Sequence, residues 1–173
     1  GMSLSETAVY FKERFSIPES LEEIKSTWMD MARDKYTNKV PLKPGAREFL
    51  VWLRQQGIRT GIASSNGIEL VETVLKAQGI QEYLESVHTC CEVPKGKPAP
   101  DIYLLVAKTL GVKPEECLVF EDVPMGILAG KNAGMRVCAV EDTFSASQRE
   151  EKKELADYYI ESYDEIPRER MQP

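Results

Sequence analysis

The stretch Val119-Phe120-Glu121-Asp122-Val123-Pro124 decides the fold class. An apolar run ends in two acids and is followed at once by a proline, which is favoured in the first turn of a helix. The pattern predicts a strand over 117–120 and a helix over 124–133. Two adjacent carboxylates repel each other unless a cation lies near them, and Mg²⁺ accepts a few protein oxygens together with water and phosphate. We therefore expect Glu121 and Asp122 to bind Mg²⁺, although a solvated acidic pair would look the same.

Strand and helix patterns alternate on both sides of this stretch. The helices read as amphipathic and several end at a glycine, as helices commonly do. Repeated strand–helix–strand units with short apolar strands imply a parallel sheet covered on both faces, a doubly wound α/β (Rossmann-like) core. Ligands of such sheets bind at the carboxyl ends of the strands. Further strands are expected at 58–63, 87–90, 136–140 and 158–160, and further helices at 45–56, after Asn66 as far as Gly79, and from Pro100 to Leu110.

Two more polar groups follow apolar runs in the same way. Ser64, Ser65 and Asn66 come directly after strand 58–63, where hydroxyl groups and unpaired backbone N–H groups can hold a phosphate; the same three residues are also ordinary helix N-caps. Lys97 lies in a loop stiffened by two prolines, so its ammonium can be aimed at the oxygens of a phosphoryl group. An exposed, solvated lysine is the simpler interpretation. The carboxyl ends of the strands thus predict a combined phosphate and metal site.

The first 40 residues follow a different pattern. Ser3 with Glu6, and Ser20 with Glu23, have the spacing of capping boxes, and each pair precedes apolar residues at helical spacing. Two amphipathic helices alone make a thin structure, which hints at further partner helices. A polar, proline-containing connector over 37–45 separates them from the α/β pattern. We expect a partial helical cap over 1–40 and the Rossmann-like core over 41–173.

Composition excludes several classes of protein. The net charge is −6, and the 22 Lys and Arg residues alternate with acids, so a nucleic-acid surface is not expected. Apolar runs are too short to cross a membrane, and the sequence opens without a basic flank followed by an apolar stretch. We expect a cytoplasmic, soluble monomer whose partner is a small molecule.

The cysteines and the single histidine do not indicate a catalytic or metal site. No two cysteines have metal-type spacing, so we expect reduced thiols rather than zinc or disulfides. His88 stands without a nucleophile motif and is interpreted as structural. The four cysteines are Cys90, Cys91, Cys117 and Cys138.

Taken in order, these motifs resemble the haloacid dehalogenase superfamily, in the branch with a helical cap that includes phosphoglycolate-phosphatase-like and β-phosphoglucomutase-like enzymes. Ser64 matches the hydroxyl of the second motif. Lys97 in Lys-Pro-Ala-Pro-Asp matches the lysine of the third. Glu121-Asp122, followed by Gly126, matches the acids of the fourth. The resemblance implies Mg²⁺-assisted hydrolysis of a small phosphorylated metabolite through a phosphoaspartate intermediate.

The sequence departs from this family at the first motif. Members begin with a strand that ends in Asp-x-Asp, whose first Asp is the nucleophile, and residues 1–173 contain no such strand. Asp30 and Asp34 cannot substitute, because both lie on the second expected helix. We expect residues 1–173 alone to be inactive. The resemblance also implies that the first strand lies between strands 58–63 and 117–120, so these two are expected not to pair but to lie about 9–10 Å apart, two strand spacings.

Three other functions compete with the phosphatase. A β-phosphoglucomutase-like mutase would need a second phosphate site on the cap, and the resembling mutases have an Arg where this sequence has Leu4. A non-catalytic relative would have no chemical need for Ser64, Lys97, Glu121 and Asp122 together. A receiver domain of two-component signalling also combines acids, a hydroxyl and a lysine around Mg²⁺, but in a different order along the chain.

Overall fold

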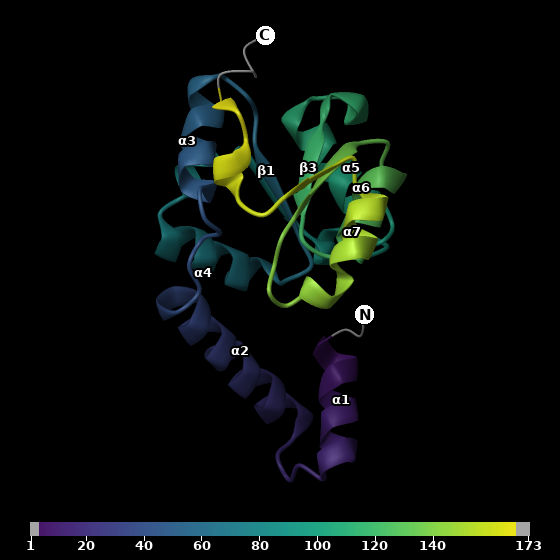
Figure 1. The fold of residues 1–173 in the computed structure, drawn as a ribbon. Helices are drawn as coiled ribbons and strands as arrows, with labels where there is room; N and C mark the ends of the chain where they lie inside the picture. The colour runs from purple at the N-terminus through teal and green to yellow at the C-terminus, as the bar shows by residue number, and fades with distance from the viewer. Residues whose placement is uncertain (1–3, 169–173) are drawn as a thin grey trace. The chain divides into compact units, whose positions relative to one another are not determined.

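The computed structural model describes residues 4–168, which divide between Val40 and Pro41 into two compact units. Figure 1 shows the elements in chain order. The helices are α1 (Leu4–Phe15), α2 (Leu21–Asn38), α3 (Ala46–Gln55), α4 (Ile68–Gln78), α5 (Asp101–Leu110), α6 (Pro124–Asn132) and α7 (Arg149–Leu155). The strands are β1 (Gly61–Ser64), β2 (Ser86–Thr89), β3 (Leu118–Glu121), β4 (Arg136–Val140) and β5 (Tyr158–Ile160).

The first unit is a pair of helices. The expected capping box of α2 is confirmed: the Ser20 side chain accepts from the backbone N–H of Glu23, and the Glu23 carboxylate accepts from the N–H of Ser20. The Ser3–Glu6 box lies outside the described residues. The rings of Phe11 and Trp28 meet edge to face at 5.2 Å between centroids, joining α1 to α2. Within residues 7–40 the buried side chains are Ala8 and Ile24 alone, which fits the expected thin structure. No helix within residues 4–168 is long and apolar enough to cross a membrane.

The second unit is built on parallel strands, as expected. β1 pairs with β2, with Ser64 opposite Thr89. β3 pairs with β4 and β4 with β5, with Glu121 opposite Ala139. Within residues 4–168 these are two separate sheets, β1-β2 and β3-β4-β5, and no ladder joins β1 to β3. The expectation that these two strands are not direct neighbours is confirmed.

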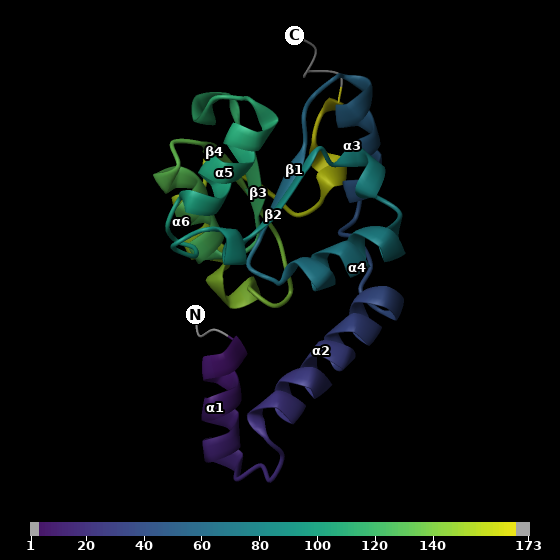
Figure 2. The ribbon, with the colours of Figure 1, turned by 180° about the vertical axis from the view of Figure 1, so that it is seen from behind.

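Helices cover these strands. α5 packs against β1 and β2, and α6 against β3 and β4 (Figure 2). Helix α6 comes close to the sheet at Gly130, where an added Cβ would approach Val137 Cγ2 at 2.7 Å. The main apolar cluster lies between α5, β3, α6 and β4 and includes Ile102, Tyr103, Val119, Ile127 and Val137. This packing holds the carboxyl ends of the strands in place.

The local structure differs in two places from what the sequence indicated. The N-cap of α4 is Gly67, so Ser64, Ser65 and Asn66 precede the helix instead of capping it. Helix α7 was not expected at all, because its sequence Arg-Glu-Glu-Lys-Lys-Glu-Leu carries no apolar periodicity.

Candidate functional site

The expected site residues follow the carboxyl ends of β1 and β3. Ser64 is the last residue of β1, and Glu121 is the last residue of β3 with Asp122 directly after it. Lys97 lies in the loop between the short 3₁₀ helix Cys90–Glu92 and α5. Because β1 and β3 belong to separate sheets within residues 4–168, their ends are joined by side-chain contacts rather than by a ladder.

Lys97 links the two sheets. Its ammonium donates to the backbone carbonyl of Ala63 in β1 at 3.1 Å and forms an ion pair with Glu121 Oε1 at the end of β3. The two side chains are only 12% and 10% exposed. An ammonium has three N–H donors, and these two contacts leave one for a ligand. Lys97 is therefore held in one place, with donor capacity remaining.

Tyr103 of α5 completes this arrangement, and sequence reasoning missed it. Its hydroxyl donates to the same Glu121 oxygen, and the Lys97 ammonium lies 4.9 Å from the centre of its ring. Burial, and then the charge of Glu121, raise the pKa of the Tyr103 hydroxyl far above its ordinary value, so it stays protonated as a donor. An aromatic residue within an amphipathic helix looks like an ordinary core residue, which is why the sequence contained no signal for it.

Glu121 is further enclosed by the start of α6. Its Oε2 accepts from the N–H of Asp122 at 3.3 Å, and its carboxyl group lies so close to Gly126 that an added Cβ would overlap it. The amino end of a helix stabilises a negative charge. Gly126 thus makes room for a carboxylate. With Oε1 taken by Lys97, this geometry favours a positioning role for Glu121, and metal binding by Glu121 stays a prediction.

Asp122 has a more open environment. Its side chain is 39% exposed, and Oδ2 lies 3.5 Å from the Nζ of Lys43. Lys43 also pairs with Asp142 and donates to the carbonyl of Glu141 at 3.1 Å. Hydrogen bonding by Lys43 lowers the pKa of Asp142. Sequence reasoning missed Lys43 because it lies in the connector over 37–45, which carries no strand or helix pattern.

These oxygens suit a hard divalent cation. The ammonium of Lys43 lies among two carboxylates and a carbonyl, so a positive charge is already accommodated beside Asp122. Carboxylate and carbonyl oxygens are the donors that Mg²⁺ prefers. No group of three or more His, Cys, Asp or Glu residues gathers as a closed metal site in the part of the chain that the structure describes. Asp122 is therefore the residue here that could hold Mg²⁺, together with water and phosphate oxygens.

The hydroxyl group at the end of β1 forms a local turn. Ser64 Oγ accepts from the backbone N–H of Asn66 at 3.1 Å, and the side chains of Ser65 and Asn66 are exposed. As an acceptor, the Ser64 hydroxyl keeps its own hydrogen for another oxygen. Ser64 can thus donate to a phosphate, whereas phosphate binding by Ser65 and Asn66 stays a prediction.

The histidine and the cysteines are not part of this arrangement. The ring nitrogens of His88 bond Glu92 at 2.7 Å and Thr109 at 2.8 Å, which fits a structural role. All four cysteines are free thiols. Burial raises the pKa of Cys90, Cys117 and Cys138, which makes these thiols less reactive.

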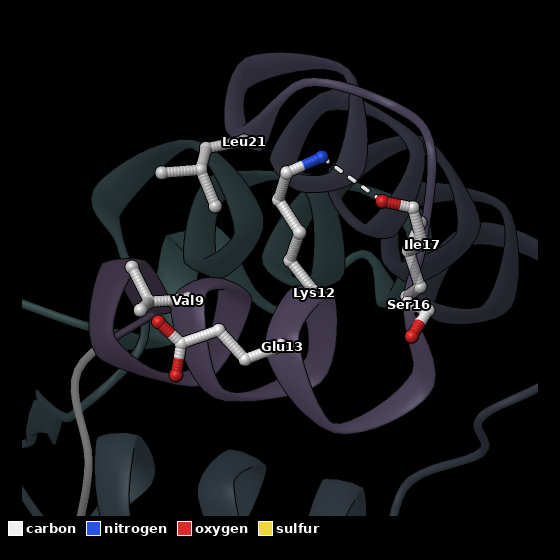
Figure 3. A pocket seen from close by; sticks show the side chains of 6 residues that line it. All are labelled: Val9, Lys12, Glu13, Ser16, Ile17 and Leu21. Carbon is white, nitrogen blue, oxygen red and sulfur yellow. Dashed lines mark hydrogen bonds between the residues drawn. The ribbon is translucent and has the colours of Figure 1, made fainter.

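A pocket of about 510 Å³ lies within the first unit, between α1 and the turn that precedes α2 (Figure 3). The Lys12 ammonium donates to the carbonyl of Ile17 at 2.9 Å and so closes this turn. The pocket contains none of the expected site residues. Its lining is Val9, Lys12, Glu13, Ser16, Ile17 and Leu21.

A family model and several known proteins resemble this chain in sequence. A family model described as haloacid dehalogenase-like hydrolase matches residues 8–134. A "Probable pseudouridine-5'-phosphatase" of Drosophila melanogaster is 35% identical over 155 residues, covering 82% of this chain and 64% of the relative. Hexitol phosphatase B of Escherichia coli (strain K12) is 32% identical over 126 residues, covering 73% of this chain. This chain spans 56% of that enzyme's length, so it corresponds to part of each relative.

Two solved structures show the same fold. CbbY of Rhodobacter sphaeroides, in complex with xylulose-(1,5)bisphosphate, superimposes with a TM-score of 0.81 at 24% identity, covering 95% of this chain and 75% of that one. β-Phosphoglucomutase of Clostridium difficile superimposes with a TM-score of 0.75 at 24% identity, covering 99% and 76%. At this identity the likeness concerns the fold alone.

Proposed function

Because the chain belongs to the haloacid dehalogenase-like hydrolase family, we propose that the full-length protein is a Mg²⁺-dependent phosphatase of a small phosphorylated metabolite. Both relatives described above are named phosphatases, and each is more than 30% identical to this chain. The observation that carries the proposal is the Lys97 ammonium, which is fixed between the ends of β1 and β3 by Ala63 and Glu121.

Lys97 and Ser64 would hold the transferring phosphoryl group. In phosphoryl transfer, negative charge spreads over the phosphate oxygens, and a fixed ammonium in a site of limited solvent access stabilises that charge. The Ser64 hydroxyl donates a second hydrogen bond. Glu121 and Tyr103 bind no substrate in this scheme; they hold Lys97 so that it need not reorganise during the reaction.

Asp122 would hold Mg²⁺, and Lys43 would orient Asp122. When bound, Mg²⁺ supplies positive charge to the phosphate and to the attacking group. Lys43 contacts Asp122 and Asp142 together, so it keeps the Asp122 carboxylate at the strand end while balancing the negative charge of the acids.

The nucleophile in this proposal is an aspartate outside residues 1–173, on a strand between β1 and β3. Support comes from the absence of a ladder between these strands within residues 4–168. The Asp oxygen would attack phosphorus while the bond to the alcohol oxygen breaks, and the alcohol takes up a proton. Water would then attack the phosphoaspartate, losing a proton and releasing phosphate and the free carboxylate.

A phosphate-release assay tests this function. Full-length protein is incubated with hexitol, sugar and nucleoside phosphates, first with EDTA and then with added Mg²⁺. We expect alcohol and inorganic phosphate in equal amounts with Mg²⁺, and neither with EDTA. An isomeric sugar phosphate formed without phosphate release would indicate a mutase instead. Turnover of no phosphomonoester would contradict the proposal.

A further inference from the structure

Lys152 of α7 is completely buried, which is unusual for a lysine. Its neighbour Lys153 has the ordinary position for a charged residue, with a side chain that is 43% exposed. Removing an ammonium from water is costly, and apolar residues of similar volume often make a protein as stable or more stable. The charge of Lys152 therefore calls for an explanation other than stability.

The ammonium of Lys152 begins a chain of hydrogen bonds that ends at Asp122. Lys152 Nζ donates to Ser145 Oγ at 2.9 Å, and Ser145 Oγ donates to the main-chain carbonyl of Asp122 at 2.5 Å. Ser145 is only 1% exposed. A hydroxyl that accepts from a charged donor is a stronger donor itself, so the two bonds reinforce each other.

The remaining contacts of Lys152 fix its position at the end of β4. Its Nζ lies 3.4 Å from both the carbonyl of Val140 and the Oε2 of Glu141. Glu141 also accepts from Arg149 at 2.7 Å and from the hydroxyl of Tyr159. The counter-charge of Lys152 is therefore the Glu141 carboxylate, which Arg149 and Tyr159 also hold in place.

The loop between β4 and α7 also reaches the Asp122 side chain. Asp142 in this loop pairs with Lys43, whose Nζ is 3.5 Å from Asp122 Oδ2. One loop therefore holds the main chain of Asp122 through Ser145 and its carboxylate through Lys43. Groups in this relation to a metal ligand commonly tune the metal's affinity.

We propose that Lys152 and Ser145 are positioning residues for Asp122: the buried ammonium orients the Ser145 hydroxyl, which fixes the Asp122 peptide so that its carboxylate is presented at the strand end. The proposal rests on the proposed function, because the role of Asp122 as the metal residue belongs to it. Lys152 and Ser145 contact neither substrate nor metal in this scheme.

The hydrogen-bond relay can be tested without any activity. In the metal-free full-length protein, the Asp122 carbonyl ¹³C resonance and the Val123 amide ¹⁵N resonance report the polarisation of their shared peptide bond. We expect both resonances to move in Ser145→Ala and in Lys152→Met, and to return toward wild type in Ser145→Thr. Lys153→Met removes the same charge from the same helix and should leave them in place. Unmoved Asp122 and Val123 resonances in folded Ser145→Ala would overturn the relay.

The positioning role is tested by the dependence of phosphatase activity on Mg²⁺. In Ser145→Ala and in Lys152→Met we expect the Mg²⁺ concentration for half-maximal rate to rise about tenfold, with a smaller change in substrate KM. Lys153→Met should need the same Mg²⁺ concentration as the wild type. An unchanged Mg²⁺ requirement together with moved resonances would overturn the role. If Lys152→Met does not fold, Ser145→Ala alone is used for both the resonance measurement and the Mg²⁺ titration. If the wild-type protein hydrolyses no phosphomonoester, the proposed function fails, while the resonances still decide whether the relay exists.

Discussion

The ammonium of Lys97 and the carboxylate of Glu121 form an ion pair between the loop before α5 and the end of β3, with both side chains little exposed. The same ammonium bonds the Ala63 carbonyl in β1, so a single side chain ties together two sheets that share no ladder within residues 4–168. Glu121 thereby determines where the positive charge of the candidate site lies. The consequences for stability and for activity can be measured separately.

Glu121→Gln should lower both the stability of the protein and its activity. It replaces charge-assisted hydrogen bonds from Lys97 and Tyr103 with weaker ones and leaves an ammonium without its counter-charge, so the free energy of unfolding should fall by about 2 kcal/mol. Chemical denaturation measures this. The matched control is Glu82→Gln, which removes the exposed pair with Arg54 and should change stability by less than about 1 kcal/mol. Equal effects of the two substitutions would show that the Lys97–Glu121 pair stabilises the protein no more than an exposed surface pair does.

Gly126→Ala should displace the Glu121 carboxylate, because the added Cβ would overlap it. Overpacking of this kind lowers the free energy of unfolding by about 1–3 kcal/mol. Gly96→Ala is the control, since a Cβ there has no neighbour within 4 Å in the described part of the chain. Thermal melts of the two variants should differ clearly. A Gly126→Ala protein as stable as Gly96→Ala would mean that Glu121 does not pack on the start of α6.

Glu141 should make the free energy of unfolding depend on pH in the acid range. Hydrogen bonds from Arg149, then Tyr159, lower the pKa of Glu141 from 4.5 to about 2. A carboxyl group with a lowered folded-state pKa stabilises the fold above its unfolded pKa, and this contribution is lost as the pH falls from about 4.5 to about 2. Glu141→Gln should therefore unfold in urea with a smaller loss of stability between pH 5 and about pH 2.

The control for Glu141→Gln is Glu150→Gln, because the Glu150 side chain is 81% exposed. It should keep the wild-type dependence on pH. A Glu141→Gln protein that loses stability over this acid range as steeply as the wild type would refute the assignment.

Asp122→Asn should abolish Mg²⁺ binding in isothermal titration calorimetry of the full-length protein. The amide has the same shape but lacks the charge that a hard cation requires. Asp101→Asn, at the start of α5, is the comparison and should bind Mg²⁺ as the wild type does. Unchanged affinity in Asp122→Asn would remove this residue from the metal site.

Most of the second unit could be predicted from short apolar runs followed by polar residues. The runs ending at Ser64 and Glu121 have that form, and both residues lie at strand ends. The prolines around Lys97 indicated a fixed lysine, and the structure places its ammonium against Glu121. These features could be predicted because each depends on neighbours in the sequence.

Contacts between distant segments could not be predicted. Lys152 lies in a helix whose one apolar residue is Leu155, and nothing in that sequence separates it from exposed Lys153. Its burial comes from Ser145 and from the end of β4. Tyr103 likewise becomes a site residue only because α5 packs where β3 ends. Each of these roles depends on tertiary packing rather than on a local pattern.

The most direct measurement compares Lys97→Ala with Lys95→Ala in the full-length enzyme, using its best phosphomonoester substrate. Lys95 is exposed and lies two residues away in the same loop, so it controls for the loss of one positive charge. We expect kcat of Lys97→Ala to fall by about 10² or more, as for other preorganised charge stabilisers, and that of Lys95→Ala to stay near wild type. Near-normal turnover by a folded Lys97→Ala enzyme would contradict the assignment of the phosphoryl site to the ends of β1 and β3.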